Sequence, residues 1–212
     1  DLRKVILTSL VLVFFDQALK IWVKTNMVLG DTRDTLFSWF KIHFIENNGA
    51  AFGLFGSSGD TTKIFLTTFR VVVVAWGIVY IYNLTKKHMP NGLLISLGLV
   101  IGGAIGNIID SLFYGVIFSD SYSKTAEIFP SSGGYGSFFK GEVVDMFQLH
   151  FFTCDLPNWL AISLPFTEKT ILNFLEGFDA KFTFFAPIFN IADAGISVGL
   201  FLLIIFYRKR FN

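Results

Sequence analysis

Charged residues are scarce in this sequence, and their scarcity excludes several classes of protein. Of the 212 residues, 16% are charged and 53% are hydrophobic, and 27 are Phe. An average soluble domain carries roughly 25% charged residues. A soluble chain of this size cannot bury so many apolar side chains, so we expect a membrane protein rather than a soluble enzyme, a disordered chain or a fibre.

Cysteine and an excess of one charge sign are also missing. The single Cys154 excludes an internal disulfide, and the 17 Lys and Arg nearly balance the 16 Asp and Glu without a basic stripe. Nucleic acid is therefore not an expected partner. His43, His88 and His150 lack ligand spacing, which argues against a catalytic metal. Cys154 has no partnered-His signature and is not an expected nucleophile, so carboxylates remain as the candidate chemistry.

Four stretches are long and apolar enough to cross a bilayer, which takes about 20 residues of helix. Pro187 suits the first turn of the last one. Asp16 and Lys20 interrupt the first stretch and no A-x-A site follows it, so we do not interpret it as a cleaved signal peptide. Because the sequence starts at Asp1 rather than Met, we expect that a few residues were trimmed. The stretches cover about residues 5–23, 64–83, 93–113 and 187–207.

Basic residues near the ends of these stretches predict the orientation. Segment 115–186 holds four basic and eight acidic residues, which is typical of an external segment. We expect both termini in the cytoplasm and residues of about 24–63 and 114–186 outside. The basic flanks lie before the first stretch, between the second and third, and after the fourth: Arg3, Lys4, Lys86, Lys87, Arg208, Lys209 and Arg210.

The external segments contain further expected elements. Residues 36–45 are aromatic and β-branched with partial alternation, which predicts a strand. Residues 116–140 indicate a flexible loop, and residues 167–178 a short amphipathic helix on the membrane surface. No internal repeat or separate soluble domain is visible. The expected fold is an all-α membrane protein: a single domain over residues 1–212, with a four-transmembrane-helix bundle and a small extracytoplasmic cap of β-sheet and loops.

Polar residues inside the predicted helices fall at one depth, near the outer side. Ionisable groups in a bilayer are costly and suggest function by default. The orientation was inferred from basic flanks alone, so its agreement with this clustering supports an interior site. The residues concerned are Asp16 and Lys20 on the first helix, Asn107 and Asp110 on the third, Asn190 and Asp193 at the start of the fourth, and Asp145 in the external segment nearby.

Small residues beside these groups indicate close helix packing. We expect Asn190, Asp193 and Ser197 to share one inward face. The small residues recur at every fourth position: Gly98, Gly102 and Gly106 on the third helix, and Gly195 and Gly199 on the fourth.

Structural explanations stay open for several of these residues. Asp16 and Lys20, at i and i+4, can simply neutralise each other. Asn107 and Asp110 can be hydrogen bonds between packed helices. Arg70 on the second helix can pair with a carboxylate or extend to an interface, and the sequence does not choose between them.

Five motifs in order resemble those of the lipoprotein signal peptidase (signal peptidase II) family. Residues 47–53 (NNGAAFG) resemble N-x-G-A-A-F-[SG], and residues 102–110 (GGAIGNIID) resemble G-G-A-x-G-N-x-x-D. Residues 143–147 (VVDMF) resemble V-x-D-F, and residues 189–196 (FNIADAGI) resemble F-N-x-A-D-x-x-I. Asp16-x-x-x-Lys20 matches the pattern on the first helix. Together these motifs extend over nearly the whole chain.

The resemblance implies an intramembrane aspartyl endopeptidase of the bacterial inner membrane, which cuts prolipoproteins before the diacylglyceryl-modified cysteine. By motif position, Asp145 and Asp193 are the catalytic pair. The implied partners are lipid-modified prolipoprotein, membrane lipid and peptide inhibitors of the globomycin type, with no cofactor or metal and with a monomeric enzyme. The implied substrate-binding or site-organising residues are Asp16, Lys20, Asn47, Gly49, Asn107, Asp110 and Asn190.

Two departures from the family pattern stand out. Ser111 occupies the position where the family usually has Arg, and we expect Ser111→Arg to fold and keep most activity. Segments 116–140 and 147–186 are longer than in typical members, face outward, and have no assigned role.

Two rival functions also fit parts of the sequence. A proton- or ion-coupled transporter would also carry polar groups in its helices. However, they lie at one depth rather than along a path, and no inverted repeat appears. A non-catalytic scaffold leaves the paired aspartates unexplained.

Overall fold

The computed structural model describes residues 2–47, 60–86, 88–150, 153–155, 181–183 and 187–210. Its long helices are α1 (Leu2–Asn26), α2 (Asp60–Leu84), α3 (Asn91–Ile109) and α6 (Ile191–Leu202). α3 continues through a π-helical turn (Asp110–Tyr114) into α4 (Gly115–Ile117), and α6 continues to Arg210. The strands are β1 (Thr32–Asp34), β2 (Phe40–Asn47), β3 (Val143–Leu149), β4 (Thr153–Asp155) and β5 (Lys181–Thr183).

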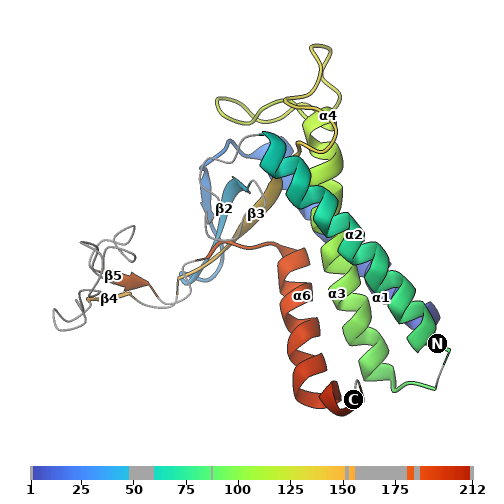
Figure 1. Ribbon diagram of the computed structural model, residues 1–212. Coiled ribbons are helices and arrows are strands. Elements are labelled where there is room, and N and C mark those ends of the chain that lie inside the picture. Colours follow the sequence, from blue (N-terminus) through green and yellow to red (C-terminus); the bar gives the residue numbers. More distant parts are fainter. Residues whose placement is uncertain are drawn as a thin grey trace, which may run out of the picture.

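Four helices in the described part of the chain are long and apolar enough to cross a membrane, which confirms the expected architecture. Their apolar side chains point outward: Phe65, Phe69 and Trp76 of α2 are 57–69% exposed. Such a surface is stable against lipid and not against water. In Figure 1, the start of α1 and the end of α6 lie at one end of the bundle, and the three-stranded sheet lies at the other. The candidate spans are Leu2–Asn26, Thr61–Leu84, Asn91–Ile117 and Ile191–Arg210.

The start of the last helix was predicted wrongly. α6 begins at Ile191, so Pro187 does not lie in its first turn. The reason is a pair of local interactions. Phe189 forms an antiparallel bridge with Phe147 of β3, and Asn190 caps the helix. Backbone that is committed to the sheet at Phe189 cannot also begin a helix there.

Glycines allow the close helix packing that the sequence predicted. A Cβ added to Gly102 of α3 would lie 2.8 Å from Cα of Ser9 on α1, and one added to Gly199 of α6 would lie 2.7 Å from the carbonyl oxygen of Ser96 on α3. The expectation for Ser197 was wrong, because its side chain is exposed. Asp193 lines the cavity while Ser197, one turn later on α6, does not, so the inward polar stripe ends in the first turn of the helix.

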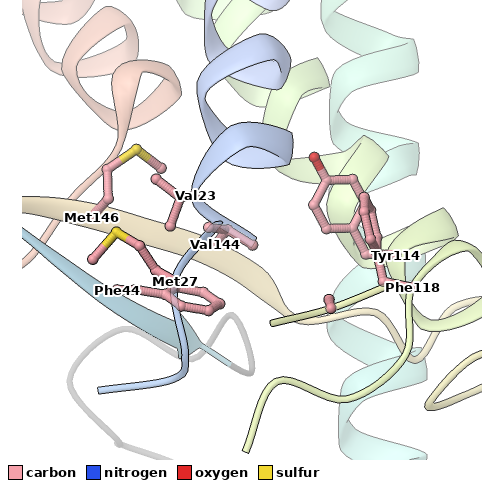
Figure 2. Close-up of a cluster of buried hydrophobic side chains, with 8 residues drawn as sticks. Val23, Met27, Phe44, Tyr114, Phe118, Val144 and Met146 are labelled. Carbon is pink, nitrogen blue, oxygen red and sulfur yellow. The ribbon is translucent and has the colours of Figure 1, made fainter. Parts of the chain in front are cut away.

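A three-stranded antiparallel sheet of order β1-β2-β3 covers the end of the bundle. The strand expected at residues 36–45 is present as β2, shifted to Phe40–Asn47. Figure 2 shows the apolar cluster that fixes the sheet against the helices. Its side chains come from the end of α1 and the residue after it, from β2 and β3, and from the continuation of α3 and the loop that follows: Val23, Met27, Phe44, Val144, Met146, Tyr114, Phe118 and Ala126.

The loop expected at residues 116–140 is helical at its start, where α4 runs to Ile117, and the rest contains no helix but is anchored to the bundle. Lys24 of α1 is fully buried, pairs with Glu46, and donates a 3.0 Å hydrogen bond to Oγ of Ser121. Its ammonium also lies 4.8 Å from the ring centroid of Tyr135. The backbone N–H of Ala126 donates to the carbonyl of Lys24 at 3.0 Å. A buried cation among aromatic rings thus ties the loop to α1.

Some expectations fall outside the described residues. These are the surface helix at residues 167–178 and the segment after Asn47, including Gly49. In the longer segment at residues 147–186, the structure describes β4 and β5 beyond residue 150, and these two strands pair antiparallel.

Candidate active site

Asp145 and Asp193 are 48 positions apart in the chain, and the sheet brings them together. Asp145 lies on β3, and the segment before α6 joins that strand. The backbone N–H of Phe147 donates to the carbonyl of Phe189 at 2.7 Å, and the N–H of Phe189 donates back at 3.1 Å. Phe147 is two residues after Asp145 and Phe189 is four residues before Asp193. The bridge therefore places the first turn of α6 beside β3.

Asn190 connects the two carboxyl groups. Its Nδ2 donates to Oδ1 of Asp145 at 2.7 Å, and its Oδ1 accepts a 2.8 Å hydrogen bond from the backbone N–H of Asp193. The backbone N–H of Asn190 donates in turn to Oδ2 of Asp193 at 3.4 Å, which completes a capping box. Asn190 is fully buried, so both ends of its amide are fixed by these contacts.

Asn107 holds Asp193 from α3. Its Nδ2 donates to Oδ1 of Asp193 at 2.8 Å. Its own Oδ1 accepts from Nζ of Lys20 at 2.9 Å and from Nδ2 of Asn190 at 3.1 Å. A flipped amide would turn an N–H group toward the Lys20 ammonium, and two donors cannot bond each other. Lys20 therefore determines that Asn107 presents a donor to Asp193.

Asp145 is almost completely enclosed, with 3% of its surface exposed. Burial first, and the nearby charge of Asp193 second, together raise the pKa of its carboxyl from 3.8 to about 7. Lys20, and amide donors such as Asn47 at 3.4 Å from Oδ2, act in the opposite direction. A carboxyl with this pKa holds a proton for much of the time at neutral pH.

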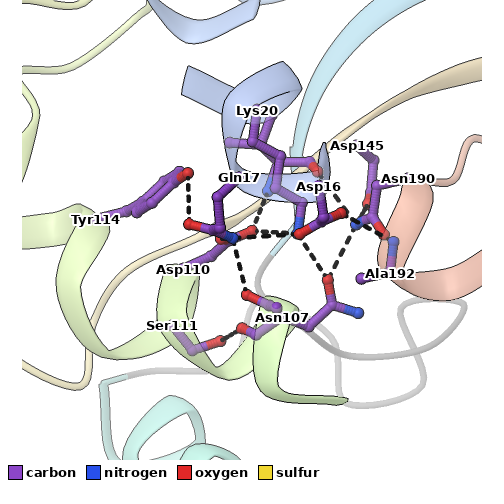
Figure 3. A network of polar contacts seen from close by, with 12 residues as sticks. Asp16, Gln17, Lys20, Asn107, Asp110, Ser111, Tyr114, Asp145, Asn190 and Ala192 are labelled. Carbon is purple, nitrogen blue, oxygen red and sulfur yellow. Dashed lines mark hydrogen bonds and ion pairs between the residues drawn. The ribbon is translucent and has the colours of Figure 1, made fainter. Parts of the chain in front are cut away.

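A buried ion cluster lies beside Asp145 and Asn190, as Figure 3 shows. Nζ of Lys20 lies 2.9 Å from Asp16 and 2.7 Å from Asp110, and all three side chains are at most 1% exposed. Asp16 accepts from the backbone N–H of Ala192 at 2.8 Å, and Asp110 from that of Val144 at 3.3 Å. The cluster thus holds the backbone next to both candidate catalytic residues. The ion pair that the sequence offered as one explanation of Asp16 and Lys20 is present, and Asp110 joins it.

The chain is similar to known proteins over nearly its whole length. The model of the family described as signal peptidase (SPase) II matches residues 8–208. The chain belongs to the signal peptidase II family. It is 44% identical over 208 residues to the lipoprotein signal peptidase of Porphyromonas gingivalis, covering 97% of this chain and 84% of the relative. It is 34% identical over 201 residues to that of Amoebophilus asiaticus, covering 93% and 74%.

Solved structures agree on the fold. A bacterial membrane enzyme determined by the in meso method at 2.3 Å resolution superposes with a TM-score of 0.56 at 23% identity, covering 97% of this chain and 87% of that one. Membership of the signal peptidase II family indicates a peptidase, and with four membrane-spanning helices it indicates a multi-pass inner-membrane protein. The transporter interpretation is thereby set aside.

Ser111, the departure from the family pattern, is buried and committed to the backbone of α3. Its Oγ donates to the carbonyl of Asn107 at 3.1 Å, and its own carbonyl accepts from the N–H of Gly141 at 3.0 Å. It is 3% exposed. The site around it is therefore packed for a small residue.

Sequence reasoning missed two site residues, Gln17 and Tyr114. Nε2 of Gln17 donates to Asp110 at 2.8 Å and to Asp16 at 3.2 Å, and its Oε1 accepts from the hydroxyl of Tyr114 at 3.1 Å. A polar amide beside Asp16 in an apolar helix was the available signal.

A cavity of about 320 Å³ opens beside Asp193 between α2, α3 and α6. Its walls are mostly apolar, and its polar end holds Arg70, Asn107 and Asp193. Within the described residues, no cluster of three or more potential metal ligands is present. The apolar lining consists of Phe69, Val73, Val74, Ala104, Ile108 and Ile196.

Proposed function

We propose that the protein is an aspartic endopeptidase that removes the signal peptide from bacterial prolipoproteins, cutting before the diacylglyceryl-modified cysteine. One observation carries the proposal. The side chain of Asn190 donates a hydrogen bond to Asp145 and accepts one from the backbone N–H of Asp193. It thereby holds a carboxyl group of β3 close to one of α6, and the charge of Asp193 raises the pKa of Asp145. Two such groups ionise as a coupled pair and share one proton near neutral pH.

A shared proton suits the hydrolysis of an amide. The ionised carboxylate takes a proton from water while the water oxygen bonds to the scissile carbonyl carbon. The protonated carboxyl gives its proton to the carbonyl oxygen, and a tetrahedral diol forms. The first carboxyl then protonates the amide nitrogen, the C–N bond breaks, and a diol proton returns to the second carboxyl. The pair ends with one proton, as it began.

The surroundings supply binding and orientation. A helical signal peptide must unwind before its amide bond is accessible, and the sheet beside Asp145 offers an extended surface for it. Asn47 on β2 is placed to bond substrate backbone or to orient Asp145. The apolar cavity next to Asp193 suits the acyl chains of the diacylglyceryl group. Asp16, Lys20 and Asp110 organise the site and do not cut.

The remaining expectations belong to the same proposal. Residues 1–212 act as one monomeric domain with both termini in the cytoplasm and the site near the outer leaflet. Membrane lipid surrounds the helices, and peptide inhibitors of the globomycin type occupy the site.

Cleavage of a defined precursor tests the proposal. The purified protein in detergent is mixed with a prolipoprotein that carries diacylglyceryl-cysteine, and the products are separated on a gel and weighed by mass spectrometry. We expect a mature product beginning at the modified cysteine, and no cleavage of a matched precursor whose cysteine is replaced by serine. An uncut lipidated precursor, or equal cleavage of both precursors, would contradict the proposal.

A further inference from the structure

Arg70 places a positive charge inside the membrane next to the candidate catalytic site. It lies ten residues into α2, about 15 Å from the start of that helix at 1.5 Å per residue. An ionisable side chain at such a depth is costly, and it marks a functional contact whose partner should be named. The side chain is half-buried and lines the polar end of the cavity together with Asn107 and Asp193.

Asp193 is a carboxylate that interacts with this cation. The charges of Arg70 and Asp193 attract each other across the cavity. Of the residues that line the cavity, Arg70 is the one with a positive charge. Two other cations in this half of the described bundle face other carboxylates, since Lys24 pairs with Glu46 and Lys63 lies 2.8 Å from Glu142.

The two carboxyl groups of the site have different surroundings. Asp145 accepts hydrogen bonds from the neutral amides of Asn47 and Asn190 and is 3% exposed. Asp193 accepts from Asn107, lies in the first turn of α6, and faces the guanidinium. A helix N-terminus and a cation both favour a carboxylate over a neutral carboxyl.

Lys20 does not remove this difference. Its ammonium also favours an ionised Asp145. However, it is bonded to Asp16 at 2.9 Å and to Asp110 at 2.7 Å, so the cluster as a whole carries one negative charge. The charge of Lys20 is therefore shared with two other carboxyl groups, whereas Arg70 lines the cavity beside Asp193.

We propose that Arg70 is a positioning residue whose guanidinium keeps Asp193 ionised, so that Asp193 activates the water and Asp145 donates the proton. This inference rests on the proposed function and adds an assignment of roles within the pair. In the first step, water gives a proton to Asp193 and its oxygen to the carbonyl carbon, while Asp145 gives its proton to the carbonyl oxygen. In the second step, Asp193 protonates the leaving nitrogen and Asp145 regains a proton from the diol.

The pH dependence of cleavage by Arg70→Gln and Arg70→Lys tests the assignment. Loss of the charge should move the acidic limb of the kcat/KM profile upward by about one pH unit, which lowers kcat/KM about tenfold at pH values below the limb. The change should appear in kcat, with KM nearly constant, because Arg70 acts through Asp193. Arg70→Lys keeps the charge and should keep the limb. Lys63→Gln removes a cation from the same helix and should leave the profile unchanged.

Each other outcome overturns the inference. A folded Arg70→Gln variant with an unchanged limb would show that Asp193 does not depend on the charge, and a change in KM alone would indicate a substrate contact. If Arg70→Gln does not fold, the double variant Arg70→Gln/Asp193→Asn, which removes both charges, should restore folded protein. Failure of that rescue would contradict the pairing.

The proposed function is tested separately by Asp145→Asn and Asp193→Asn. If both of these variants are inactive and the limb of Arg70→Gln is unchanged, the assignment fails while the aspartic mechanism stands. If either aspartate variant cuts normally, the mechanism itself fails.

Discussion

Asn190 donates a 2.7 Å hydrogen bond to Oδ1 of Asp145, and with the same side chain it caps the helix that carries Asp193. One amide therefore has two separable roles. The cap stabilises α6, and the bond to Asp145 orders the two carboxyl groups. The two roles make different demands on the residue at position 190.

Substitution at position 190 separates these roles. Ser caps helices nearly as well as Asn but is too short to reach Asp145 in the same way, whereas Ala does neither. We expect Asn190→Ser to keep most of the stability and to lose at least about tenfold in kcat, because the orientation of Asp145 relaxes. Asn190→Ala should lose the same activity and, in addition, about 0.5–2 kcal/mol of stability. Thermal unfolding and cleavage rates measured on both variants check this, and equal stability of the two would refute the capping role.

The raised pKa of Asp145 predicts how stability and activity depend on pH. Its folded pKa of about 7 lies above the ordinary value of 3.8, so the folded protein binds this proton more tightly than the unfolded chain. The stabilisation is complete below about pH 4, declines as the pH rises from about 4 to 7, and is absent above that. Asp145→Asn removes a buried charge, so we expect it to have a higher Tm than the parent protein at pH 8.

The matched control for that comparison is Asp34→Asn, since Asp34 is an exposed carboxylate. The gain in Tm of Asp145→Asn should shrink toward pH 5, whereas Asp34→Asn should change Tm little at either pH. Activity of the parent protein should fall as the pH rises past about 7, where Asp145 loses its proton. A gain in Tm that is independent of pH would count against the raised pKa.

The structure reverses the expectation for Ser111→Arg. Ser111 is 3% exposed and its hydroxyl bonds the carbonyl of Asn107, so a guanidinium has to be buried in a space packed for serine. Burying a charge without a partner costs several kcal/mol. We expect Ser111→Arg to yield little folded protein in size-exclusion chromatography, whereas Ser111→Ala should fold and lose about 1 kcal/mol. A folded and active Ser111→Arg variant would show that a partner for the cation is available.

Orientation in the membrane is tested by chemical labelling. In a background with Cys154→Ala, a membrane-impermeant thiol reagent applied from outside should label a cysteine at Ser132, in the loop near the sheet. It should not label a cysteine at Lys86, between α2 and α3. The reverse pattern would place the sheet and the site on the cytoplasmic side.

Hydropathy predicted the bundle because lipid allows apolar side chains to face outward along a whole helix. Apolar residues such as Phe65 and Trp76, which face outward on α2, made that helix recognisable from its composition alone. The small-residue repeat at Gly98 and Gly102 likewise predicted close packing, since a residue without a side chain lets the backbone of a neighbouring helix approach, whichever helix that is.

The site was predictable as a set of residues, but its geometry was not. The motifs gave Asp145 and Asp193 without showing how they meet, because the bridge between Phe147 and Phe189 depends on a backbone pairing over 42 positions. Because of the same pairing, α6 begins at Ile191 and not at Pro187, where the sequence predicted its start. Gln17 was missed because two of its partners, Asp110 and Tyr114, lie far away in the sequence, although a polar amide in an apolar helix was a local signal.

The most direct measurement of the central claim is cleavage of a lipidated prolipoprotein by Asp145→Asn and Asp193→Asn, with Asp34→Asn as the exposed control. Each of the two site variants keeps the size of its side chain and loses its capacity to transfer a proton, so each alone should abolish cleavage while still folding and binding a peptide inhibitor. The control should cut like the parent protein, and EDTA should leave that cleavage intact. Substantial cleavage by either Asp145→Asn or Asp193→Asn would contradict the catalytic pair.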